Sequence, residues 1–136
     1  MTRKPPQRLP ENCRRSVLAT AASVGLLRDV TETFLRKYGL DHVIDDSRVI
    51  VSELATNAVN AVPGTVVVLD VRLLQDRPEL LIELWDQSSR RPVQVPAGPD
   101  DETGRGLAIV GALAADWGVR YPPNGGKTVW ATLKVP

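Results

Sequence analysis

Three polar side chains share one face of a predicted helix near the middle of the sequence. Glu53, Asn57 and Asn60 are spaced four and then three residues apart, and residues at these spacings lie one above another on a helix. A carboxylate beside a carboxamide can accept a proton and bind magnesium, and phosphoryl transfer needs both. The alternative is an ordinary solvated face, since Glu and Asn are common on surfaces. The other side of the helix is apolar and suits packing: Ile50, Val51, Leu54, Ala55, Ala58 and Val62.

A second candidate is Asp86, which follows a predicted strand over residues 79–85. A carboxylate at the end of a buried strand can accept a hydrogen bond from the amino group of adenine, and guanine could not satisfy it in the same way. An aspartate that only caps the following loop is the alternative interpretation, because Asp is common at strand ends.

Two glycines surround Arg105 in the stretch Gly104-Arg105-Gly106-Leu107. They leave the backbone free to approach an anion, and a helix predicted over residues 107–115 offers its positive N-terminus. Phosphate is the expected ligand. The stretch lacks the spacing of a dinucleotide fingerprint or a P-loop, so an ordinary helix start is the alternative.

The last predicted strand begins with Gly126-Lys127-Thr128. We expect Thr128 to place its hydroxyl against Asp86 and the adenine. Lys127 is either a phosphate contact or a solvated strand residue, and the second interpretation is favoured because lysine often begins an exposed strand.

The remaining sequence predicts the elements that must position these groups. Residues 14–20 form a strand and residues 24–38 a helix with Ser23 as its N-cap. Asp41 caps a second helix, which stops at Pro63-Gly64. Strands follow at 65–74 and 79–85, and again at 117–121 and 127–135 after the third helix. This order predicts an antiparallel or mixed sheet with helices packed on one face. The stretch 87–103 contains three prolines and is long for a connection, so we expect a mobile lid.

Composition limits the function classes. A chain of 136 residues fits one domain, and its 43% hydrophobic and 24% charged residues are typical of a soluble protein. We expect a flexible tail over residues 1–13, a domain over 14–136, no membrane span, no signal peptide and a cytoplasmic location. The net charge of +1 gives no general attraction to nucleic acid. The single cysteine, Cys13, cannot form an internal disulfide.

In order and spacing, these motifs resemble the ATP-binding modules of histidine kinases and gyrase-type ATPases, and most closely the bacterial anti-sigma factor serine/threonine kinases. Ser52-Glu53-Leu54-Ala55-Thr56-Asn57-Ala58 is similar to the N-box of that family, and Asp86 to its adenine-binding aspartate. The other two matches are the glycine box at 104–107 and the final box at 126–130. The resemblance spans residues 14–135, with two departures: Gln87-Ser88-Ser89-Arg90 replaces the usual glycines, and Asn60-Ala61-Val62 lacks a histidine.

The resemblance implies a two-layer α/β sandwich with a mixed sheet, known as the Bergerat fold. It implies ATP and Mg²⁺ as cofactors, Asn57 as the metal ligand, and Glu53 as the general base. The nucleotide would also be bound by Asp86, Gly104, Arg105, Gly106, Leu107 and Thr128. The implied function is an anti-sigma factor that phosphorylates its antagonist protein, with a sigma factor as the other partner and a homodimer left open. The alternative is a nucleotide-sensing binding module that sequesters a regulatory partner and transfers nothing.

Overall fold

The computed structural model describes residues 12–88 and 102–136, with the side chains of residues 102–106 left aside. Within these ranges, strands and helices follow one another in the order β1 (Cys13–Leu18), α1 (Ala21–Lys37), the short 3₁₀ helix η1 (Asp41–Val43), α2 (Ile44–Ala61), β2 (Val66–Leu73), β3 (Glu79–Asp86), α3 (Glu102–Leu113), β4 (Asp116–Arg120) and β5 (Lys127–Lys134).

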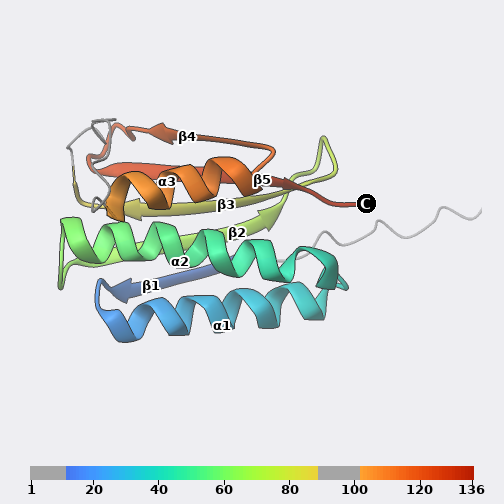
Figure 1. Ribbon diagram of the computed structural model, residues 1–136, viewed down its shortest axis with the longest axis horizontal. Helices are drawn as coiled ribbons and strands as arrows, with labels where there is room; N and C mark the ends of the chain where they lie inside the picture. The colour runs from blue at the N-terminus through green and yellow to red at the C-terminus, as the bar shows by residue number, and fades with distance from the viewer. Residues whose placement is uncertain (1–11, 89–101) are drawn as a thin grey trace, which may run out of the picture.

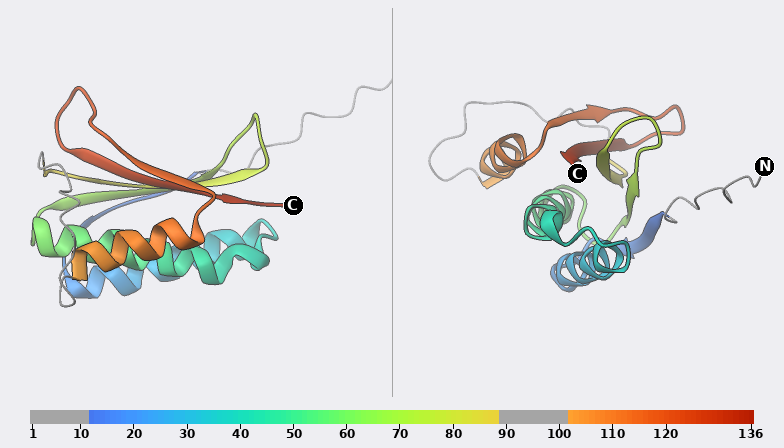
Figure 2. Two further views of the ribbon diagram at one scale, coloured as in Figure 1. Left: turned by 45° about the horizontal axis from the view of Figure 1, so that its top comes forward. Right: turned by 90° about the vertical axis from the view of Figure 1, so that its right-hand side faces the viewer.

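The five strands form one sheet in the order β1-β2-β3-β5-β4. Figures 1 and 2 show the three helices lying together on one face of this sheet, so the predicted two-layer α/β sandwich is confirmed. All four strand pairings are antiparallel, which corrects the mixed sheet. For β1 and β2 the reason lies in the connection between them. Two helices separate these strands, so the chain reverses direction three times and the two strands run in opposite directions.

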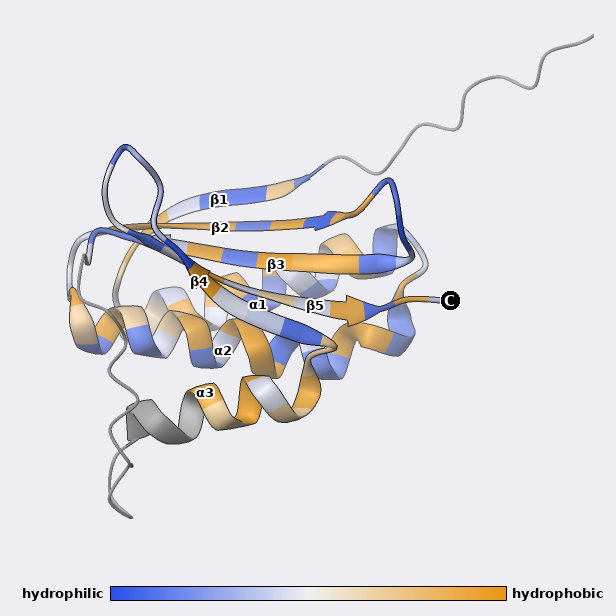
Figure 3. Cartoon of the chain, turned by 90° about the horizontal axis from the view of Figure 1, so that it is seen from above, coloured by the Kyte–Doolittle hydropathy of each residue, from blue (hydrophilic) through white to orange (hydrophobic). Residues whose placement is uncertain are grey.

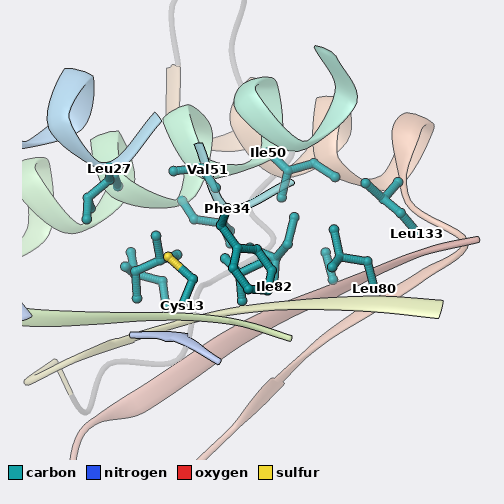
Figure 4. Close-up of a cluster of buried hydrophobic side chains, with 14 of the residues drawn as sticks. Cys13, Leu27, Phe34, Ile50, Val51, Leu80, Ile82 and Leu133 are labelled. Carbon is teal, nitrogen blue, oxygen red and sulfur yellow. The ribbon is translucent and has the colours of Figure 1, made fainter. Parts of the chain in front are cut away.

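The core lies between the helices and the sheet. Alternate residues of β2 and β3 face the helices, because successive side chains of a strand point to opposite faces, and Leu69, Leu80 and Ile82 are fully buried there. Figure 4 shows Leu27, Phe34, Ile50 and Val51 in this layer together with strand residues, and Figure 3 shows the apolar residues along β3 and α3. Helix α2 is therefore held by its apolar side, as its sequence pattern predicts.

The helix starts differ from the sequence predictions. Thr20, not Ser23, is the N-cap of α1: its Oγ1 accepts from the Ser23 backbone N–H at 3.2 Å. Asp41 does not cap α2 but begins η1, and its carboxylate pairs with Arg36 at 3.6 Å. A side-chain oxygen caps a helix only from just outside its first turn; Thr20 holds that position before α1, whereas Val43 holds it before α2 and leaves that helix without a side-chain cap.

Candidate functional site

A pocket of about 180 Å³ opens between α2, α3 and the ends of β3 and β5. Its lining combines apolar walls with carboxamide, carboxylate and ammonium groups: Leu54, Asn57, Asn60, Ala61, Leu84, Asp86, Leu107, Lys127 and Val129. Concave sites with a few polar groups among apolar residues are typical of small-molecule binding. The structure thus brings Asn57 and Asp86 together although they are far apart in the sequence.

Helix α2 supplies the carboxamides. Because residues four apart share a helix face, Asn57 lies one turn after Glu53, and Leu54 and Ala61 of the same helix also line the pocket. Glu53 itself is half-buried and is not among the lining residues. Arg28 Nη1 of α1 donates a hydrogen bond of 3.0 Å to Oγ of Ser52, the residue before Glu53. This contact ties α2 to α1 next to Glu53.

Asp86 ends β3 and is 3% exposed. Its Oδ1 accepts a hydrogen bond from the Ser88 backbone N–H at 2.7 Å, and its Oδ2 lies 4.0 Å from Lys127 Nζ. Burial raises the pKa of the Asp86 carboxyl above its ordinary value, while the Ser88 N–H and the Lys127 ammonium act in the opposite direction. The Ser88 contact is also that of a loop-capping aspartate, so both sequence interpretations of Asp86 have a structural counterpart.

The start of β5 corrects two expectations. Lys127 pairs with Asp86 across the strands and its side chain is only 12% exposed, so the solvated interpretation is wrong. Thr128 pairs with Trp85 and lines a different hollow, on the face of the sheet without helices. The expected contact of its hydroxyl with Asp86 is therefore also wrong. Strand alternation, counted back from the buried Ala131 and Leu133, was the signal that could have found Lys127.

The glycine box lies inside α3 rather than before it. The helix begins at Glu102, so Gly104, Arg105 and Gly106 belong to its first two turns, and the expected start at residue 107 is wrong. Of the four residues predicted here, Leu107 lines the pocket. The contacts of the other three lie outside what the structure describes, as do the predicted tail up to residue 11 and nearly all of the lid.

A family model, described as a histidine kinase-like ATPase domain, matches residues 17–133. This range includes both sides of the pocket and almost every described helix and strand. The chain belongs to this family. Membership supports an ATP-using kinase or ATPase, and accords with the antiparallel sheet and its helix layer. A comparison with curated proteins gives no match.

The pocket residues fit this chemistry. A pocket of about 180 Å³ is below the roughly 300–1,000 Å³ usual for small-molecule sites, so the described walls have room for only part of a nucleotide, such as its base. Magnesium prefers oxygen ligands and usually keeps waters and phosphate oxygens, so one carboxamide from Asn57 suits it. The described residues contain no group of three His, Cys, Asp or Glu side chains able to hold a metal. None of the helices in the described ranges is long and apolar enough to cross a membrane.

Proposed function

We propose that the protein is an ATP-binding anti-sigma factor that phosphorylates a serine or threonine of its antagonist protein. The observation that carries the proposal is the meeting of Asn57 of α2 and Asp86 of β3 in one pocket, with Glu53 one helical turn before Asn57. Base recognition, metal binding and proton acceptance are then available from adjacent positions.

In the proposed reaction, the antagonist's hydroxyl oxygen attacks the γ-phosphorus of ATP. Its bond to phosphorus forms as the bond to the bridging oxygen of ADP breaks, and Glu53 accepts the hydroxyl proton. When bound, Mg²⁺ offsets the charge of the phosphates, and Asn57 would be its protein ligand. Asp86 would hold the adenine amino group.

One observation favours a module that binds ATP and a regulatory partner without transferring phosphate. Gln87 and Ser88 stand where related proteins have glycines, and the Ser88 N–H occupies one oxygen of Asp86. With one oxygen already hydrogen-bonded, the Asp86 carboxylate has less capacity to bind adenine. The protein would then sense ATP by binding it and would not transfer its phosphate.

Incubation of the protein with γ-labelled ATP, Mg²⁺ and candidate antagonists from the same organism tests the two functions. Phosphoserine or phosphothreonine on one antagonist supports the kinase. A stable complex with a sigma factor and bound ATP, but no labelled protein, supports the binding module. No adenine nucleotide binding at all would refute both.

A further inference from the structure

Lys127 is an unusual neighbour for a carboxylate that binds a base. The two residues are opposite each other in the pairing of β3 with β5, and strand partners that face the same side lie close together. Both line the same pocket, with side chains 12% and 5% exposed for Lys127 and Asp86. A desolvated ammonium is costly unless its charge and its donors are matched, so this lysine needs an acceptor.

The contact with Asp86 satisfies the charge of Lys127 but not its hydrogen-bonding capacity. Nζ and Oδ2 are 4.0 Å apart, beyond the roughly 2.7–3.2 Å of a hydrogen bond from nitrogen to oxygen. An ammonium has three donors, and in the described part of the chain Asp86 is its one ion-pair partner. Of the two Asp86 oxygens, Oδ1 accepts a hydrogen bond from the Ser88 N–H. Oδ2 accepts none from the described residues. An unused acceptor and an unused donor therefore stand next to each other at the pocket wall.

Adenine presents the matching pair on the edge used in base pairing. Its N6 amino group is a donor and the adjacent ring nitrogen N1 is an acceptor. Guanine, in the same pose, presents an oxygen acceptor and an N1–H donor, so the oxygen would face the carboxylate and the N–H would face the ammonium. Reversed contacts of this kind leave buried polar groups unpaired, which is a strong basis for rejecting a ligand.

We propose that Asp86 and Lys127 read adenine together, with Asp86 accepting from N6 and Lys127 donating to N1. Lys127 is then a second specificity-determining residue of this chain, in the place where Thr128 was expected to act. The inference deepens the proposed function and rests on its assignment of ATP to this pocket.

The test is a cycle that combines one substitution with the removal of one ligand atom. Calorimetry with Mg²⁺ measures the affinity of the full chain for ATP and for 1-deaza-ATP, in which a C–H replaces N1. We expect the wild type to bind 1-deaza-ATP about tenfold more weakly, the loss of one hydrogen bond with a charged partner. Lys127→Met should lose about the same factor for ATP and bind the two ligands equally, because the N1 contact is already gone.

Two further variants complete the design. Lys127→Gln keeps a donor near N1 and should retain part of the preference for ATP. Lys134→Met removes an exposed lysine of the same strand and should keep the full preference.

A preference for ATP over 1-deaza-ATP that persists in Lys127→Met would overturn the proposal. Equal affinities in the wild type would also overturn it, and this comparison needs no variant to fold. If Lys127→Met weakens both ligands equally but leaves adenosine unaffected, Lys127 contacts phosphate and not the base. Wild-type protein that binds no adenine nucleotide would refute the proposed function itself, whereas wild-type binding without an N1 effect refutes this inference alone.

Discussion

Two buried aspartates on opposite faces of the sheet show how similar residues differ in use. Asp86 faces the helices and lines a pocket with carboxamides and apolar walls. Asp70 faces the side of the sheet without helices, is 9% exposed, and lies 3.4 Å from Arg14. Burial raises the pKa of both carboxyls. A perturbed pKa alone therefore does not mark a site in this molecule, although such values often gather at sites.

The surroundings make the difference. On the outer face, Asp70 belongs to a row of ion pairs, in which Glu83 contacts Arg72 at 3.4 Å and Arg120 at 2.6 Å. These arginines are exposed and remain in water, so each pair stabilises the fold little. On the inner face, Lys127 is the one ion-pair partner of Asp86 among the described residues, and apolar side chains line the pocket around the two. The inner carboxylate is the one that shares a pocket with the carboxamides of α2 and with a lysine that lacks a hydrogen-bond acceptor within the described ranges.

The largest expected effect is on phosphotransfer, when the proposed base Glu53 of α2 is replaced. Glu53→Gln keeps the size of the side chain but cannot accept a proton as a carboxylate does, so phosphotransfer to the antagonist should fall by a factor on the order of a hundred or more. Nucleotide binding should survive. Initial rates with labelled ATP measure this, with Glu79→Gln at the start of β3 as the control. Unchanged transfer in Glu53→Gln would remove Glu53 from the mechanism.

Exchanging either aspartate for asparagine tests the comparison directly. Asp86→Asn should weaken ATP binding by roughly ten- to a hundredfold, because a charged acceptor is lost, whereas Asp70→Asn should leave affinity unchanged. Wild-type binding should also weaken as pH falls toward the pKa of Asp86, since the charged carboxylate is a stronger acceptor than the protonated carboxyl group. The raised pKa places this loss at higher pH than for an ordinary aspartate. Titration calorimetry at several pH values measures both effects. Equal losses in the two variants would contradict the assignment.

The turn before β5 should be sensitive to a single methyl group. Gly126 has φ of +75°, and a Cβ there would collide with the backbone oxygen of Asp86 and the ring of Trp85. Both Gly126→Ala and Gly125→Ala should lower the free energy of unfolding by about 1–3 kcal/mol, the usual cost of a strained backbone conformation, and Gly126→Ala should lower it further because of the collision. Gly125→Ala, where φ is +98° and the added Cβ meets open space, is the matched control. Chemical denaturation of both variants should rank Gly126→Ala as the less stable.

The smallest effect is expected for the stability of Asp70→Asn. Asp70 Oδ1 is buried without a hydrogen bond, and Arg14 is 68% exposed on its side chain, so the change should be under about 1 kcal/mol at neutral pH. Because folding raises the pKa of Asp70, the folded state binds its proton more tightly, and the free energy of unfolding falls as pH rises from the ordinary value to the raised one. Asp70→Asn should flatten that slope in urea unfolding at several pH values. A loss above about 2 kcal/mol would show that the arginine contacts outweigh burial.

The sequence predicted most of the elements because their signals are local. The apolar period of α2 and the stop at Pro63-Gly64 are both present in the structure, where α2 ends at Ala61. The meeting of Asn57 with Asp86 came from the resemblance, since no local pattern reports how α2 packs on β3. Predictions failed where a shift of one residue along the sequence changes the direction in which a side chain points. Thr128 and Lys127 differ by one position, and in a strand that step changes the face of the sheet. Gly104 and Gly106 were likewise expected just before a helix, although they lie within its first two turns.

The sheet order has a consequence for synthesis of the chain. Strand β5 lies between β3 and β4, so β5, which is synthesised after both of its neighbours, must insert between them. The growing polypeptide can form the hairpin of β2 and β3 and dock α2 on the ribosome, since domains fold as their segments emerge. Lys127 and the wall below Asp86 arrive only with β5. Until those residues leave the exit tunnel, a nascent chain has the helix that carries Glu53 and Asn57 but lacks one wall of the pocket.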